Sequence, residues 1–85
     1  MATIQARRIE KHEDLDDTEY CYYKSDGQWY LYMPGCGLAG LRNHTVVEHD
    51  DGTITVTPSI LTTGHESGKS VEKHGFLEKG IWRDC

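Results

Sequence analysis

Three glycine turns divide most of this chain into pairs of short strands. The turns are Ser25-Asp26-Gly27, Asp50-Asp51-Gly52 and Glu78-Lys79-Gly80, and each places a glycine after two residues suited to a type I turn. A glycine at that position can take a positive φ and form the bulge of a three-residue hairpin loop. The turn chemistry therefore predicts a chain built from antiparallel hairpins.

The residues on both sides of each turn have the composition of strands. Aromatic residues flank the first turn, in segments 20–23 and 28–32, and they suit a pleated surface. After the second turn, residues 53–57 alternate threonine with aliphatic residues, a period that marks a half-buried strand with Ile54 and Val56 facing inward. The third and shortest hairpin pairs residues 75–77 with 81–83.

Pro58 is predicted to stop the middle strand or to place it at an edge, because proline cannot donate to the ladder. Residues 62–70 then read as a polar loop. No ten-residue amphipathic helical pattern occurs. We therefore predict a mainly β fold, a small antiparallel sandwich or a partly open barrel built from three hairpins. The β domain would span residues 19–85, after a charged N-terminal arm, or a short extended strand, in residues 1–18.

Charge and apolar pattern exclude several classes of function. A net charge of -5 without a basic patch argues against nucleic-acid binding, which needs clustered Lys and Arg. No apolar run approaches the roughly 20 residues that span a bilayer, and the N-terminus lacks a signal-peptide core. Three cysteines, an odd number, predict a protein of a reducing cytoplasm rather than a disulfide framework. Residues 13–19 contain five acidic residues and no basic one. This composition predicts a solvated linker or a docking arm for a basic partner.

The segment from Gly35 to Gly40 satisfies the pattern G-x-G-x-x-G after a predicted strand. A dinucleotide site needs a helix to begin at the third glycine, so that its N-terminus faces the pyrophosphate. Here residues 41–49 run into a β-branched strand instead. We therefore interpret this segment as a glycine-rich connection between the first two hairpins.

Cys36 lies in Pro34-Gly35-Cys36-Gly37, which has the form of a zinc knuckle. The position three residues earlier, where a second cysteine is usual, is Met33. A zinc site would therefore have to draw its other ligands from distant positions, and the candidates are His44, His74 and Cys85. The alternatives stay open: His74 also reads as a surface imidazole at a strand start, and Cys85 as a chain end.

Four short motifs in residues 29–85 resemble one family when taken in order. They are Met33-Pro34-Gly35-Cys36, residues 55–61, residues 74–81 and Asp84-Cys85. In order and spacing they are similar to the small phage and bacterial proteins of the uncharacterised family called domain of unknown function 6527 (DUF6527). Many of its phage members carry the label ammonia monooxygenase. Nothing in this chain supports that label, because it has neither a membrane span nor a copper or iron constellation.

The resemblance implies a setting and a site. It places Cys36 and His74 near a metal, with Cys85 as a third member, while Met33 and Lys73 stand where the family has cysteines. We expect a non-enzymatic phage-type β domain that binds protein, either virion proteins or itself, with Zn²⁺ as the hypothesised cofactor. It would decorate a capsid or tail, or act as a host-directed factor in the host cytoplasm. The alternative is a small metal-dependent hydrolase using Cys36 and His74, with a carboxylate such as Glu48 or Asp84 as general base.

Overall fold

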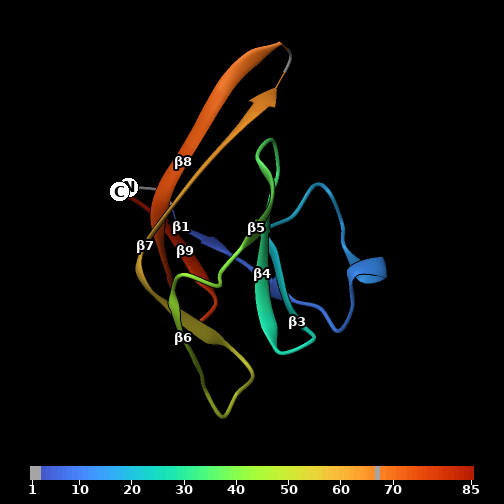
Figure 1. Ribbon diagram of the computed structural model, residues 1–85, viewed down its shortest axis with the longest axis vertical. Helices are drawn as coiled ribbons and strands as arrows, with labels where there is room; N and C mark the ends of the chain where they lie inside the picture. The colour runs from blue at the N-terminus through green and yellow to red at the C-terminus, as the bar shows by residue number, and fades with distance from the viewer. Residues whose placement is uncertain (1–2, 67) are drawn as a thin grey trace.

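Two β-sheets packed face to face form the protein, and the computed structural model describes residues 3–66 and 68–85 (Figure 1). The larger sheet has five antiparallel strands, and the smaller one has four strands of mixed direction. The predicted mainly β fold is confirmed as a sandwich, and the sheets do not close into a barrel. The described residues contain no α-helix, and no helix among them is long and apolar enough to cross a membrane.

The strands of each sheet come from distant parts of the chain. The larger sheet has the order β1 (Thr3–Gln5), β9 (Ile81–Asp84), β8 (Lys69–Glu78), β7 (Ile54–Glu66) and β6 (Thr45–Glu48). The smaller sheet has the order β2 (Arg7–Arg8), β3 (Cys21–Ser25), β4 (Gln28–Met33) and β5 (Gly37–Gly40). A short 3₁₀-helix, η1 (His12–Asp14), lies between β2 and β3.

All three predicted hairpins form, but two of their turns are tighter than expected. Ser25 pairs with Gln28, and the two residues between them, Asp26 and Gly27, both have positive φ. Lys79 and Gly80, which connect β8 to β9, also both have positive φ. Two-residue loops of this kind match the right-handed twist of the strands better than type I turns do. Only the turn before β7 keeps the predicted glycine bulge, at Gly52 with φ +88°.

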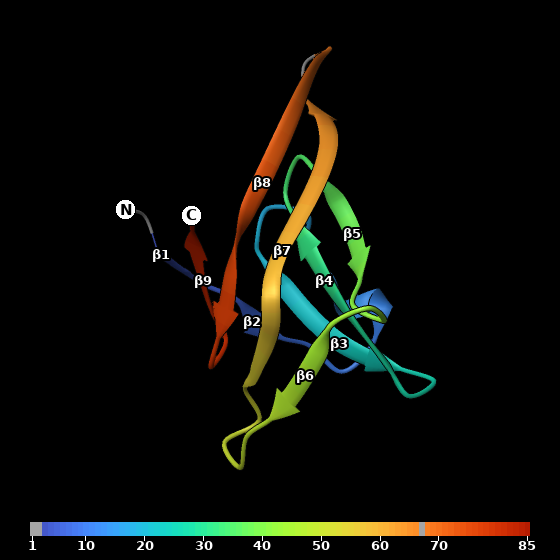
Figure 2. The ribbon, with the colours of Figure 1, turned by 60° about the vertical axis from the view of Figure 1, so that its left-hand side comes forward.

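Two segments predicted as connections are strands. Gly37–Gly40 is β5, which pairs with β4 from Tyr30↔Gly40 to Met33↔Gly37, so the connection between hairpins is shorter than predicted. Of the predicted loop at residues 62–70, residue 67 lies outside the described residues, and the others belong to the far part of the β7–β8 hairpin, which extends beyond the other strands in Figures 1 and 2. Pro58 does not end β7; it lies where the β7–β8 register shifts, and such an irregularity is a place where a strand tolerates proline.

The core lies between the sheets and is rich in aromatic residues. Trp82 is fully buried and contacts residues from both layers, and Tyr20 packs on it with ring centroids 6.0 Å apart. A smaller cluster lies on the outer face of the four-stranded sheet, where Ile9 and Leu15 from the acidic N-terminal region cover Cys21 and Tyr23. Burial of apolar side chains on both faces of one sheet lets a chain of 85 residues build enough core.

The N-terminal residues join the two sheets. β1 pairs with β9 at the edge of the larger sheet, and β2 then pairs parallel to β3 in the smaller one. The chain crosses at Ala6, whose side chain is buried and whose N–H donates to the Gly80 carbonyl at 2.8 Å. Figure 2 shows this crossing on one side of the sandwich and the connection from β5 to β6 on the other. The predicted short extended strand is therefore present within residues 3–8.

Candidate functional site

The structure brings two of the four predicted metal ligands to one serine. His44 Nε2 lies 3.2 Å from the carbonyl oxygen of Ser59, and His74 Nε2 lies 2.9 Å from its hydroxyl. The backbone N–H of Cys85 donates to the carbonyl of His74 at 2.8 Å. His44 and His74 therefore both border Ser59, and the backbone of Cys85 lies beside that of His74.

Cys36 lies on the opposite side of the five-stranded sheet from His74. Its side chain is partly buried against the core between the layers, and its backbone faces Gly64 of β7. His74 is on the outer face, because its neighbour Gly75 pairs with buried Ile60 and successive residues of a strand alternate between faces. In residues 3–66 and 68–85, no three His, Cys, Asp or Glu side chains are grouped to hold a metal ion. Zinc binding by this chain stays a prediction.

The two carboxylates considered as general bases have structural partners. Glu48 forms an ion pair with Arg8, with Oε2 2.9 Å from Nη1. Asp84 accepts a hydrogen bond from the indole N–H of Trp82 at 2.7 Å. Each carboxylate therefore stabilises the fold at its own position, and neither faces Cys36 and His74 together.

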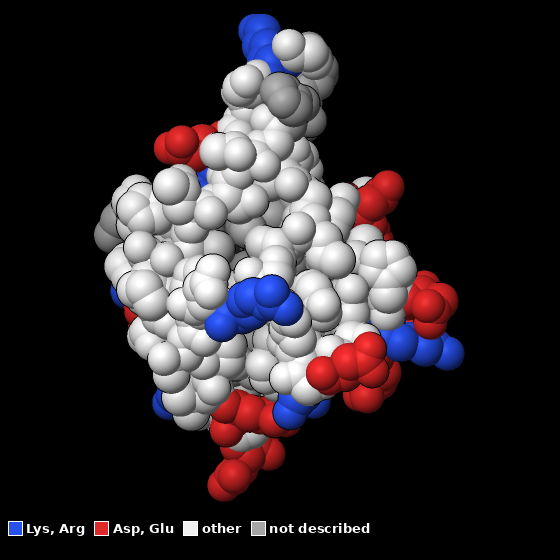
Figure 3. All heavy atoms as spheres, in the orientation of Figure 1, with Lys and Arg blue, Asp and Glu red and all other residues white. Residues whose placement is uncertain are grey.

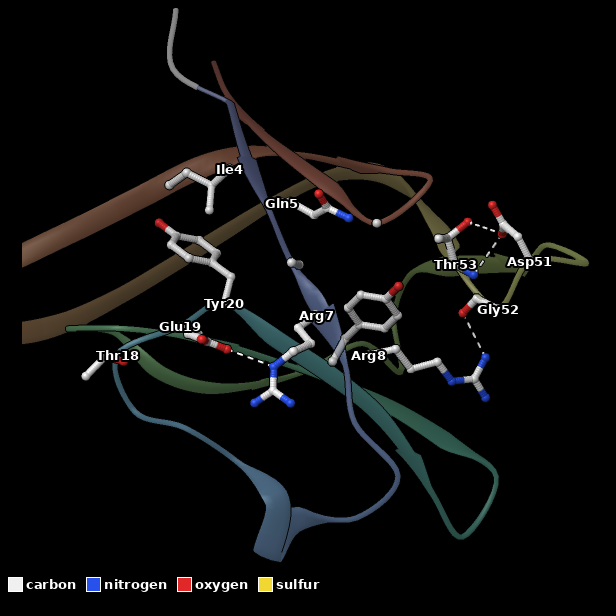
Figure 4. A pocket seen from close by; sticks show the side chains of 13 residues that line it. Ile4, Gln5, Arg7, Arg8, Thr18, Glu19, Tyr20, Asp51, Gly52 and Thr53 are labelled. Atoms are coloured by element: carbon white, nitrogen blue, oxygen red, sulfur yellow. Dashed lines mark hydrogen bonds and ion pairs between the residues drawn. The ribbon is translucent and has the colours of Figure 1, made fainter.

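A groove of about 720 Å³ lies where β1 and β2 cross between the sheets (Figure 4). Its two arginines are both engaged: Arg7 pairs with Glu19 at 2.8 Å, and Arg8 donates to the Gly52 carbonyl at 2.8 Å. The Arg8 guanidinium also lies 5.2 Å from the ring centroid of Trp29. Since binding an anion here would require breaking these pairs, we interpret the groove as the joint that holds the β6–β7 turn to the smaller sheet.

A different surface is formed by the two edge strands β5 and β6. β5 and β6 are the last strands of their sheets, and they follow each other in the chain on the same side of the molecule. From Met33 to Val47 the only Lys, Arg, Asp or Glu is Arg42. We call β5, β6 and the residues 41–44 that join them the open-edge side. Figure 3, in the orientation of Figure 1, shows a broad surface that is mostly free of charged side chains, with one basic side chain near its middle and acidic side chains towards its right and lower borders.

Sequence reasoning missed the open-edge side because it treated residues 35–40 as a connection. A signal was present: Met33 and Gly37 are separated by three residues that include Gly35, a spacing typical of a hairpin loop. Gly35 and Gly37 both take positive φ there, at +85° and +84°. The glycines therefore serve a β-turn, where the pattern had suggested a phosphate loop.

No protein-family model, curated protein sequence or solved structure matches this chain. The resemblance to DUF6527 therefore stays a prediction that depends on four short motifs.

Proposed function

We propose that this chain is a non-enzymatic β domain that acts by binding another protein along its open-edge side. The observation that carries the proposal is the pair of edge strands β5 and β6: β5 has no charged residue, and the one charged residue of β6, Glu48 at its end, is paired with Arg8. An edge strand presents unpaired N–H and C=O groups, and proteins that must stay monomeric usually protect such strands with charges, proline or bulges.

The other edge of the smaller sheet, which is formed by β2, differs from β5 in charge. β2 is the outer strand there, and both of its residues, Arg7 and Arg8, are charged and paired with glutamates. The outer strand β2 therefore carries charge, whereas β5, at the other edge of the same sheet, carries none. Addition of a partner strand to an exposed edge is an established mode of protein recognition, in which main-chain hydrogen bonds supply affinity.

The experiment uses a display library of random peptides and maps the selected peptides by amide NMR. We expect chemical-shift changes concentrated in β5 or β6, and loss of binding when Leu38 and Val47, exposed on these two strands, are both changed to lysine. The matched control is Leu61→Lys, another exposed aliphatic residue, on β7. Binding that maps to the β7–β8 hairpin or the arginine groove, or that survives the double change, contradicts the proposal.

The biological setting follows from the resemblance described above. We propose a virion accessory on a capsid or tail, or a host-directed factor in the infected cytoplasm. Mass spectrometry of purified particles separates the two, because a decoration protein is present in many copies per particle and a host-directed factor is absent.

A further inference from the structure

We infer that β5 is the strand that receives the partner, and that the partner is a basic, extended segment added as a fifth strand to the smaller sheet. This inference rests on the proposed protein-binding function and names the chemistry of the partner. Three independent features of β5 and its surroundings lead to it: the backbone groups that point outward, the tyrosine surface beside them, and the acidic segment that borders this surface.

The first feature is the direction of the β5 backbone groups. The N–H of Leu41 donates to the carbonyl of Trp29 at 3.0 Å, so this pair is hydrogen-bonded. Hydrogen-bonded pairs alternate along an antiparallel ladder, so Ala39 also points its N–H and C=O towards β4. Leu38 and Gly40 must then point theirs away from the sheet. The edge therefore offers two donors and two acceptors in the spacing that an added strand requires.

The second feature is the outer face of the sheet next to β5. Leu38 lies opposite Tyr32, and Gly40 lies opposite Tyr30. Leu38 is 43% exposed, and a Cβ added at Gly40 would meet the Tyr30 ring and the end of the flexible Gln28 side chain. Tyr30 is held in place by stacking on Tyr23, with centroids 5.4 Å apart. An apolar side chain of an added strand would therefore contact preorganised rings at little cost in conformational entropy.

The third feature is the charge beside these tyrosines. Residues 13–19 cross the same outer face, where Leu15 packs against the tyrosine cluster and the Tyr32 hydroxyl donates to the Asp17 carbonyl at 3.4 Å. Glu19 is paired with Arg7, but within the described ranges no ion pair involves Glu13 or Asp17. The chain as a whole carries a net charge of -5. Lys or Arg side chains of a strand beside β5 would face this acidic segment.

The same charges disfavour a second copy of the chain as occupant. Pairing of β5 with its own copy about a twofold axis would keep both outer faces on one side of a continuous sheet. Both acidic segments would then lie on that side, and each chain brings a net charge of -5. A basic partner segment reduces this repulsion, whereas a second copy increases it.

The probe is a synthetic peptide that alternates lysine and valine, compared with a second peptide in which glutamate replaces lysine. Binding is followed by fluorescence anisotropy, and the amide signals of Leu38 and Gly40 by NMR. We expect binding of the basic peptide, weaker at about 300 mM than at about 50 mM salt because salt screens the attraction. The acidic peptide should not bind.

Two variants separate the backbone from the side chain. Leu38→Lys should weaken binding about tenfold or more, as expected for a residue central to an interface. Leu38→Pro removes one outward N–H and no ladder hydrogen bond, and should also weaken binding several-fold. Leu61→Lys, on the other sheet, should bind like the unchanged protein. The NMR spectrum shows whether each variant is folded.

Several results would overturn the inference. They are no binding of the basic peptide, equal binding of the acidic peptide, or unchanged binding by both folded Leu38 variants. Shifts confined to β6 would also overturn it, while the proposed protein-binding function would stand. The same holds if sedimentation shows self-association that Leu38→Lys abolishes, because a second copy would then be the occupant. Library peptides that bind only away from both edges would instead refute the proposed function.

Discussion

Gly64→Ala tests the contact between the two sheets that the sequence did not predict. A Cβ at this position would lie 2.5 Å from the carbonyl oxygen of Gly35 and 2.6 Å from the Cα of Cys36. Both neighbours are backbone atoms, so no side-chain rotation relieves the clash. The β4–β5 turn and β7 would have to separate by about 0.9 Å to reach ordinary contact at 3.4 Å.

The expected cost follows from two opposing effects. Overpacking of a close contact typically costs about 1–3 kcal/mol. Replacing glycine by alanine also reduces the entropy of the unfolded chain, which stabilises by about 0.4–1 kcal/mol. We therefore expect a net loss of about 1–2 kcal/mol, and about 4–8 °C in Tm for each kcal/mol in a domain of this size.

The assay is urea unfolding monitored by tryptophan fluorescence, with Gly40→Ala as the matched control. Gly40 is also a strand glycine without positive φ, but its added Cβ would meet only the end of the flexible Gln28 side chain, at 3.2 Å. This variant should be neutral or slightly more stable. A second readout is thiol labelling: displacement of the turn should make partly buried Cys36 react faster. If both variants unfold at the same urea concentration, the β4–β5 turn does not rest on β7 and the sandwich geometry is wrong.

Three further predictions concern the joint, the turns and the core. Arg8→Ala should lower the free energy of unfolding by about 1–2 kcal/mol, because it removes a hydrogen bond to a backbone carbonyl, an ion pair and a contact with an indole ring. The control Arg83→Ala should lower it by less than about 1 kcal/mol, because both side chains of its ion pair are exposed. Equal losses for the two variants in chemical denaturation would refute the role of the joint. The pKa values of Asp16 and Asp51 should lie below the ordinary aspartate value in an NMR titration, because the threonine hydroxyl two residues later donates to each carboxylate. Since a lowered folded-state pKa stabilises above the unfolded value, this contribution should disappear as the pH falls through the folded-state pKa, and ordinary values would contradict the turn geometry. Trp82→Ala should lose about 3–5 kcal/mol in urea unfolding, because the side chain is fully buried between the sheets, and a loss below about 1 kcal/mol would place it outside the core.

Local sequence determined the hairpins because their information is short-ranged. Glycine after a polar turn residue, and alternation along residues 53–57, are properties of a few neighbouring positions. Ile54 and Val56 are buried as that alternation predicts. The two-residue length of the first and third turns was harder to predict. Asp26 and Lys79 both take positive φ there, because such turns match the twist of the paired strands, and this twist is not a property of the turn residues themselves.

The candidate sites depended on distance across the fold and were harder to predict. Cys36 and His74 are related in sequence only by resemblance, and the alternation of β8 places them on opposite faces of one sheet. The proline in β7 indicated a strand end or an edge position, and the polar residues 62–70 indicated a loop. Pairing with β8 instead keeps this segment extended, because each added pair supplies hydrogen bonds that local preference cannot anticipate.

By itself the sequence determined a mainly β chain with an acidic segment and one nearly uncharged stretch from Met33 to Val47. Tertiary structure decided where that stretch lies. It makes β5 and β6 the last strands of two sheets, and it lays the acidic segment beside Tyr30 and Tyr32. Which strand is last in a sheet depends on pairing between residues far apart in the chain, so only the assembled sandwich could show which edge is open.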